Sequence, residues 1–187
     1  PRDVASEYIK DLQETLLRDD CYIPDCPACD VTDIALKGEI TASSNAPDCP
    51  PQMVTNGVTR YRNAQTNQWA SATGQELPQW LMVEFLQPRQ VQEVHLTFDS
   101  GFTRPLTLTH SDWFNNQIIR APQPETVRDF QIEGLCGETW ETLFKQQGNY
   151  QRKCVCKFSM KTVSALRIVA LATNQDPVAR IYELRIY

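Results

Sequence analysis

The stretch from Ala165 to Tyr187, ALRIVALATNQDPVARIYELRIY, indicates the fold more clearly than any other part of the chain. Apolar side chains occupy every second position in each half of it. Successive side chains of a β-strand point to opposite faces of the sheet, so this period of two predicts two strands, each with one face toward a core. The residues between them, Thr-Asn-Gln-Asp-Pro, have the composition of a turn. We therefore expect the last residues of the chain to close a sheet.

The same alternation recurs in short segments from Ile34 onward. Strands are predicted over residues 35–43, 80–85, 91–98, 127–135, 139–146 and 153–160, with a turn at 87–89 and a long loop at 45–68. Many short strands separated by turn residues, with no intervening helices, favour an antiparallel arrangement over a doubly wound fold. The predicted fold class is all-β, an antiparallel jelly-roll β-sandwich over residues 34–187.

The first 33 residues have a different pattern, an N-terminal helix followed by a linker. Apolar residues at helical spacing predict a helix over residues 3–18, with Asp3 as its N-cap. Residues 19–33 are rich in Pro, Asp and Cys, which predicts a cross-linked linker. Because the sequence starts at Pro1 without a signal-like segment, we expect a processed or excised piece of a longer protein.

The charge and hydropathy of the chain exclude two classes of partner. Its net charge is −5, without a long run of either sign, whereas nucleic acids and anionic membranes require a concentrated basic surface. No apolar run approaches the roughly 18–20 residues that span a bilayer. We therefore expect no nucleic-acid partner and no membrane span.

The 7 cysteines are many for a reducing compartment. Their density favours disulfides, and with them an extracytoplasmic or secreted location. At least one disulfide is expected among Cys21, Cys26, Cys29 and Cys49, and another between Cys136 and Cys154 or Cys156. A zinc site of four thiolates in the first cluster, with Cys26-x-x-Cys29 as its chelating half, is the alternative.

No catalytic motif is present in the sequence. It lacks the glycine-rich nucleotide loops, the HExxH zinc motif and the GxSxG nucleophile motif. Its two histidines, His95 and His110, are fifteen residues apart and have no partner at ligand-like spacing. This chain is therefore predicted not to be an enzyme.

One segment, NGVTRYRNAQTNQWASATGQELPQWLMVEF, carries a family resemblance. Its Asn56-Gly57 turn, its Asn67-x-Trp69 and its Trp-Leu strand, with Glu183 and Tyr187 at the end of the chain, resemble the discoidin-like (coagulation factor 5/8 C-type) galactose-binding β-sandwich. The order of further segments resembles the C-terminal region of bacterial FAD-dependent oxidoreductases. The flavin fingerprint is absent, so we expect no FAD bound by this chain alone.

The resemblance also implies a calcium site. In related sandwiches the loop at this position wraps a calcium ion, which implies Asn56, Asn67 and Glu183 as metal ligands here. The family's Asp and Thr are replaced by Asn56 and Asn67, which costs one negative charge. The alternative is a calcium-free turn held by the Asn side chains.

The aromatic residues divide between the core and a loop. Trp69 and Trp80 adjoin strand patterns and are predicted in or at the edge of the core. The loop from 99 to 126 is long and aromatic, and such loops in compact domains are usually functional. Its ligand-binding candidates are His110, Trp113, Phe114, Asn115 and Asn116.

An aromatic platform beside amides suits a stacked sugar ring. The predicted function is a non-catalytic accessory module that binds carbohydrate or an extracellular polymer. One alternative is a structural domain that packs against an upstream FAD-dependent oxidoreductase domain of the same polypeptide, and another is part of a polysaccharide hydrolase. If they bind no ligand, Trp113 and Phe114 are expected to cover the edge of the sandwich or to pack on the N-terminal helix.

Overall fold

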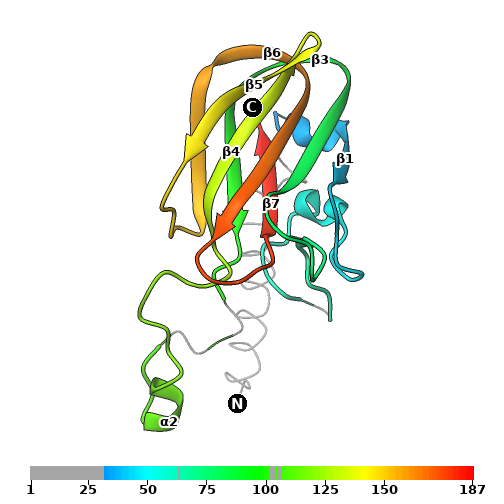
Figure 1. The fold of residues 1–187 in the computed structure, drawn as a ribbon. Coiled ribbons are helices and arrows are strands. Elements are labelled where there is room, and N and C mark those ends of the chain that lie inside the picture. Colours follow the sequence, from blue (N-terminus) through cyan, green and yellow to red (C-terminus); the bar gives the residue numbers. More distant parts are fainter. Residues whose placement is uncertain (1–31, 63, 102–103, 105–106) are drawn as a thin grey trace, which may run out of the picture.

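The computed structural model describes residues 32–62, 64–101, 104 and 107–187 (Figure 1). The predicted helix and most of the cysteine-rich linker lie outside these residues. Among the described residues, no helix has the length and apolar character needed to cross a membrane. The elements are η1 (Ile34–Lys37), β1 (Gly38–Ala42), η2 (Pro51–Thr55), β2 (Trp69–Ala70), β3 (Gln79–Phe98), α2 (Asp112–Asn115), β4 (Val127–Cys136), β5 (Thr139–Gln146), β6 (Lys153–Thr173) and β7 (Arg180–Ile186).

Within the described residues, the strands form one continuous 7-stranded antiparallel sheet, as the alternation predicts. Its strands follow the order β2-β7-β3-β6-β4-β5, and β1 also pairs with β3. The long strands β3 and β6 each take part in both layers of a sandwich. The first half of β3 lies between β1 and the second half of β6, next to β4 and β5. The second half of β3 lies between the first half of β6 and β7.

Both long strands bend over at the same place. The β3–β6 register shifts between Glu84 and Arg89 and again between Val91 and Glu93, and irregularities of this kind let a strand turn a corner between two sheets. Leu86, at the corner, is 99% exposed. The predicted break at 87–89 is therefore a change of direction, but the prediction of two separate strands there is wrong. Residues 153–173 likewise form one strand rather than two.

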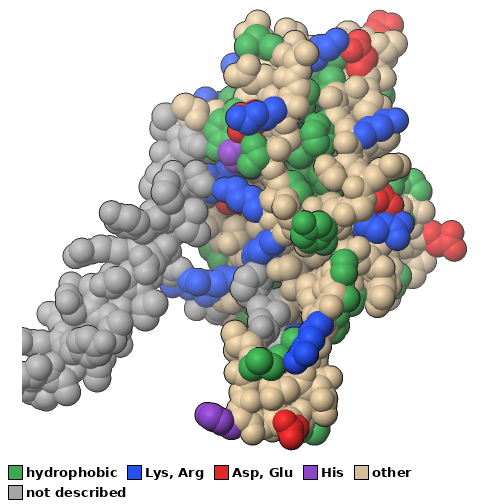
Figure 2. Space-filling view, turned by 90° about the vertical axis from the view of Figure 1, so that its left-hand side faces the viewer, with side chains coloured by type: hydrophobic (Ala, Val, Ile, Leu, Met, Phe, Trp, Pro, Cys, Tyr) green, Lys and Arg blue, Asp and Glu red, His purple; other side chains and the backbone are tan. Residues whose placement is uncertain are grey.

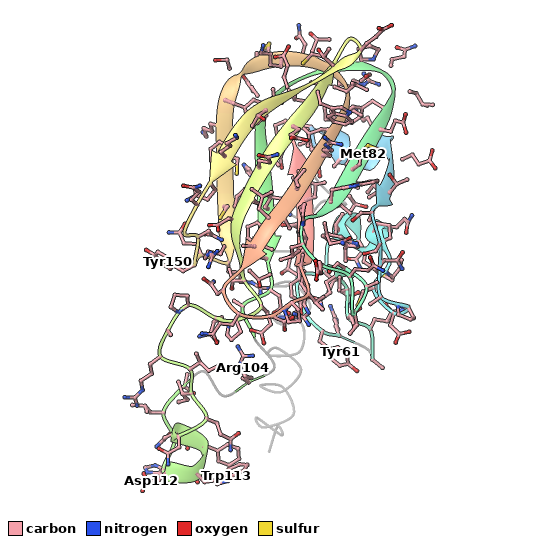
Figure 3. All side chains as sticks on the ribbon, viewed as in Figure 1. Tyr61, Met82, Arg104, Asp112, Trp113 and Tyr150 are labelled. Carbon is pink, nitrogen blue, oxygen red and sulfur yellow. The ribbon has the colours of Figure 1, made fainter. Side chains whose placement is uncertain are left out.

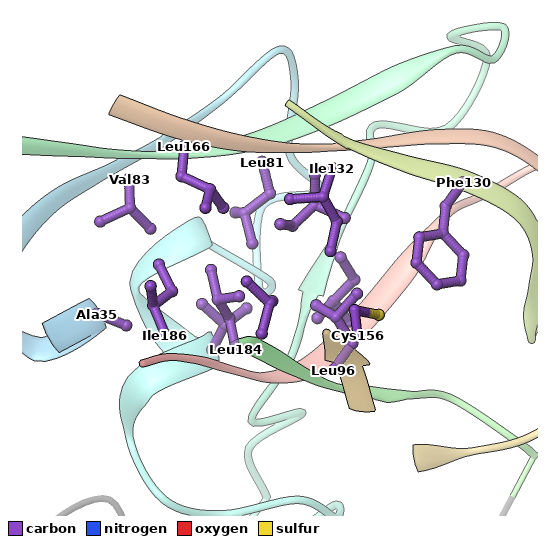
Figure 4. Packing of buried hydrophobic residues seen from close by; sticks show 14 of the residues in the cluster. Ala35, Leu81, Val83, Leu96, Phe130, Ile132, Cys156, Leu166, Leu184 and Ile186 are labelled. Carbon is purple, nitrogen blue, oxygen red and sulfur yellow. The ribbon is translucent and has the colours of Figure 1, made fainter. Parts of the chain in front are cut away.

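The core lies between the two layers (Figure 4). Leu81, Val83 and Leu166 point inward from the first layer and meet Leu96, Leu184 and Ile186 from the second. Trp69 is fully buried, in agreement with its predicted place, and its indole Nε1 donates to Ser44 O at 2.9 Å. Trp80 is partly exposed.

The two ends of the sandwich differ, and we name them for what they carry. The hairpin end holds the β4–β5 turn and the corners of β3 and β6. The loop end holds the connections at 43–68, 71–78, 99–126, 147–152 and 174–179. The C-terminal end of β7 lies toward the hairpin end, where the Asp33 carboxylate accepts hydrogen bonds from Ala35 N at 2.9 Å and Ile186 N at 3.0 Å. The loop end therefore points away from the end where the first described element meets the last strand.

The predicted disulfide of Cys136 is wrong. Cys136, Cys154 and Cys156 are free thiols. The backbone of Cys136 is the strand partner of Thr139 at the hairpin end, whereas Cys154 is the second residue of β6 at the loop end. The two cysteines therefore lie at opposite ends of the sandwich. Cys49 is also a free, buried thiol, and its predicted partners Cys21, Cys26 and Cys29 lie outside the described residues.

Candidate functional site

The loop from 99 to 126 leaves the loop end and carries the predicted sugar site at its tip (Figures 1 and 3). The tip is a single helical turn, α2, closed by Asn115. The Asn115 amide donates to Thr109 O at 2.9 Å and accepts from Thr109 N at 2.8 Å. Asn116 caps α2 through its backbone N–H, which donates to Asp112 O at 2.9 Å. The Asn115 side chain and the Asn116 backbone therefore shape the loop, and the Asn115 side chain is not available for a ligand in this arrangement.

The aromatic pair at the tip is open to solvent. Trp113 is 67% exposed and Phe114 45% exposed. Their rings pack edge to face, with centroids 4.8 Å apart, an arrangement that aromatic pairs prefer. His110 is exposed on the same loop. In Figure 2 the loop is a projection at the foot of the molecule, and a histidine and an acidic side chain lie at its tip.

The base of this loop is held by an ion pair. Arg104 binds Glu125 through both carboxylate oxygens, with Nη2 to Oε2 at 2.8 Å, and also donates to Gln123 Oε1 at 2.7 Å. The hydrogen bond from Arg104 holds the pKa of Glu125 below its ordinary value. Gly101, with φ +67° in the left-handed region that favours glycine, lies directly beside the Arg104 guanidinium. The loop is therefore held at its base by the Arg104–Glu125 ion pair and at its tip by the Asn115–Thr109 hydrogen bonds.

The structure brings Asn56 and Asn67 together, as the calcium hypothesis requires. Asn56 Nδ2 donates to Asn67 Oδ1 at 2.9 Å. Asn67 Nδ2 in turn points at backbone carbonyl oxygens of its own loop, Arg60 O at 3.1 Å and Gln65 O at 3.2 Å, with Arg62 O at 3.5 Å. Carbonyl oxygens that converge on one point can hold a cation. Here an amide nitrogen occupies that point.

Glu183, the third predicted calcium ligand, has other partners. Its carboxylate accepts from Arg185 Nη2 at 2.7 Å and from Thr97 Oγ1 at 3.2 Å, and it is 6% exposed. A buried carboxylate already paired with a guanidinium supplies little free charge to a cation. The observed arrangement therefore fits the turn held by Asn side chains better than a calcium site, and calcium binding stays an untested prediction.

A pocket that the sequence analysis missed lies at the β5–β6 connection. Its volume is about 230 Å³. We call it the β5–β6 pocket; it is lined by Phe144, Gln146, Gly148, Asn149, Tyr150, Gln151, Cys154, Val155 and Cys156. Tyr150, 66% exposed, lies at one side of the loop end in Figure 3, well separated from Trp113. The Gly148-Asn149-Tyr150 sequence was the available signal, a turn followed by an exposed aromatic.

The floor of the pocket is apolar and uncharged. Cys156 is 1% exposed. Burial raises the pKa of Cys154 to about 11 and that of Cys156 to about 12, so both thiols stay protonated at neutral pH. A buried, protonated thiol is a poor nucleophile and metal ligand. Within the part of the chain that the structure describes, no group of three or more His, Cys, Asp or Glu side chains is placed to hold a metal ion.

No protein-family model and no curated protein matches the sequence. Solved structures do match the fold. The family 32 carbohydrate-binding module of C. perfringens NanJ, in complex with galactose, has a TM-score of 0.60 at 16% identity and covers 81% of this chain and 94% of its own. The chitosan-binding module 1 of a Paenibacillus sp. IK-5 chitosanase/glucanase has a TM-score of 0.59 at 18% identity, covering 83% and 98%.

A third neighbour is the family 32 carbohydrate-binding module of Streptococcus pneumoniae EndoD, with a TM-score of 0.57 at 14% identity, covering 81% and 97%. At such identities the likeness concerns the fold alone. It confirms the predicted sandwich, whereas the link to FAD-dependent oxidoreductases stays a prediction. The described chain has the discoidin-like, galactose-binding-like β-sandwich fold of family 32 carbohydrate-binding modules.

Proposed function

We propose that this chain is a non-catalytic accessory module that binds carbohydrate at the loop end of its sandwich. The observation that carries the proposal is Trp113, a large aromatic side chain that is 67% exposed on a loop clasped at its tip and anchored at its base. A ring on a loop that is held by its own hydrogen bonds loses less conformational freedom when a sugar ring stacks on it than one on an unconstrained loop. The solved neighbours, several of which bind saccharides, support the same proposal.

Within this proposal Trp113 supplies the stacking face and Phe114 supports it from the edge. His110 is close in sequence and exposed, and it can hydrogen-bond a ligand hydroxyl. Asn115 and Asn116 act indirectly, because they hold the turn that presents the ring. The chemistry required is recognition alone: a ring face, a few hydrogen bonds and no bond cleavage.

A glycan array followed by calorimetry tests the proposal. Trp113→Ala should weaken binding of the strongest array ligand by about 1–3 kcal/mol, by analogy with other stacked rings, while the melting temperature stays unchanged. Trp140→Ala is the matched control, because Trp140 is 36% exposed at the opposite, hairpin end. Equal affinity of the Trp113 variant and the wild type would refute Trp113 as the binding residue.

The alternative partner is an upstream domain of the same polypeptide. The projecting loop would then be an interface, and loss of Trp113 would weaken association of that domain rather than glycan binding. An extracytoplasmic location is part of the carbohydrate proposal. It rests on the class of ligand, because the disulfide argument no longer extends to Cys136, Cys154 and Cys156.

A further inference from the structure

We propose that the β5–β6 pocket is a second saccharide subsite, which accepts one neutral sugar unit with its ring face on Tyr150. This inference rests on the proposed carbohydrate-binding function and adds a site, separate from the Trp113 tip, that takes uncharged sugars. It is carried by the position, lining and rigidity of the pocket.

The pocket lies where the two layers of the sandwich part. β5 is the outermost strand of the first layer, and the first half of β6 is an outer strand of the second. The connection 147–152 crosses from one to the other and forms the rim. Phe144 lines the pocket from β5, and its ring stacks on the buried Phe130 with centroids 6.2 Å apart. The pocket is therefore a gap between fixed elements, with an apolar floor.

The rim is rigid because Asn149 holds it from inside. Asn149, 5% exposed, donates through Nδ2 to Val127 O at 2.8 Å and to Gln151 O at 3.1 Å. Its Oδ1 accepts from Gln151 N at 2.9 Å. The next residue, Arg152, donates to Phe98 O at 3.2 Å and lies over the Tyr182 ring at 5.0 Å. Tyr150 is thus exposed while the residues on both sides of it are fixed, so its ring is presented to a ligand at little entropic cost.

The lining selects for uncharged, polar ligands. Among the residues that the structure describes, no charged side chain lines the pocket, and the thiols on its floor are protonated. An ionised ligand group would lose hydration there without an opposite charge in return. Within the described part of the chain, the side-chain amide of Gln151 and the hydroxyl of Tyr150 have no hydrogen-bond partner, and both are available to sugar hydroxyls. Figure 2 shows the face that carries the β5–β6 connection, with uncharged surface down its middle.

The size of the pocket indicates a single ring. Sites for drug-sized ligands enclose about 300–1,000 Å³, and this pocket has about 230 Å³. A pyranose unit presents an apolar C–H face and a periphery of hydroxyl groups. The Tyr150 ring and Val155, 47% exposed, can cover the face, while Gln146 and Gln151 meet the hydroxyls.

Chemical-shift mapping of the 187-residue chain tests the inference. The probes are lactose, which is neutral, and an oligomannuronate, which is acidic. Lactose should shift the amide signals of residues 144–156, and the oligomannuronate should not. Tyr150→Ala, a change at an exposed position, should weaken the lactose response at these residues by about tenfold or more. Gln151→Ala should weaken it as well, and Trp113→Ala should leave it in place.

Each of the other possible results would overturn one stated part of this inference. Shifts confined to residues 107–117 would overturn the subsite and leave the proposed function standing. An undiminished lactose response at residues 144–156 in Tyr150→Ala would overturn the role of the ring. An equal response to the oligomannuronate would overturn the neutral class of ligand. If neither probe nor any array glycan shifts either region, both the subsite and the proposed function fail.

Discussion

At the scale of single residues, Asn67 shows how one side chain organises a loop. It is 3% exposed, and its φ of +51° lies in the left-handed region, which Asn tolerates better than most residues. Its amide nitrogen meets the carbonyl oxygens of its own loop, and its amide oxygen accepts from Asn56. The side chain therefore satisfies inward-facing oxygens that would otherwise need a cation or water.

This geometry predicts that the wild-type melting temperature is the same in calcium and in chelator. Asn67→Asp should lower the free energy of unfolding in chelator by about 1–3 kcal/mol, because a carboxylate cannot donate to the carbonyl oxygens. Calcium should restore part of the loss by binding the folded state. Thermal melts of both proteins, with and without calcium, measure the effect.

Asn45→Asp is a suitable control, since the one side-chain hydrogen bond of Asn45 within the described residues is to Ala46 O, on an exposed segment of the same connection. It should show no calcium response. A rise in the wild-type melting temperature with calcium would contradict the amide arrangement and support the predicted cation site at Asn56, Asn67 and Glu183.

At the scale of elements, the 99–126 loop depends on the Arg104–Glu125 pair at its base. The pKa of Glu125 is lowered, so the carboxylate is more acidic in the folded than in the unfolded chain. Stability from a lowered carboxyl pKa is complete above the unfolded value, here near 4.5, and is lost as the pH falls through the folded value.

We therefore expect the loop to loosen on acidification below about pH 4.5. Glu125→Gln should remove much of this dependence while it lowers stability at neutral pH by about 1–3 kcal/mol. Thermal melts across that range, together with hydrogen exchange of the loop, measure both effects. Glu138→Gln, at an exposed position of the β4–β5 turn, is the control. An unchanged acid response in the Glu125 variant would assign it to other carboxylates.

The strands also show which features of the fold the sequence predicts and which it does not. Leu166, Ile168 and Ala170 are buried as their alternation indicates, because side-chain direction in a strand is a local property. The corner of β3 is not local. Its two halves join different layers through partners far along the chain, such as Glu84 with Ala165 and Glu93 with Lys157.

In the candidate site, too, the sequence predicts some features and not others. The aromatic residues of the 99–126 loop could be chosen from composition, and Trp113 is indeed exposed. The hydrogen bonds between Asn115 and Thr109 could not be predicted from the sequence, because a side-chain amide can bind a ligand and the backbone of its own loop equally well. Tyr150 was missed because its presentation depends on Asn149 bonding to Val127, which is distant in sequence.

At the scale of the whole molecule, β3 and β6 make the two layers one structural unit. Each strand supplies core side chains to both layers, for instance Leu81 and Leu96 from β3. Loss of the strand pairing in one layer would therefore also disrupt β3 and β6, which belong to the other layer as well.

We expect the described sandwich to unfold in a single cooperative transition. Leu166→Ala, in the first layer, should lower the free energy of unfolding by about 2–5 kcal/mol. It should shift the far-ultraviolet circular dichroism and the Trp fluorescence, to which the buried Trp69 next to β7 contributes, to the same new midpoint. Coincident transitions are the test of two-state behaviour. Two separate midpoints in the variant would contradict the shared-strand account.

The Asp33 carboxylate, which bonds both Ala35 N and Ile186 N, has a mechanical consequence. Tension applied between Asp33 and Tyr187 would act first on this contact and on the end of β7, since both lie toward the hairpin end. The connections at the opposite end would carry no load until β7 began to peel away. Resistance to pulling is governed by the barrier to unfolding rather than by equilibrium stability. The proposed carbohydrate site at the loop end would therefore bear none of this tension until the contact at the far end gave way.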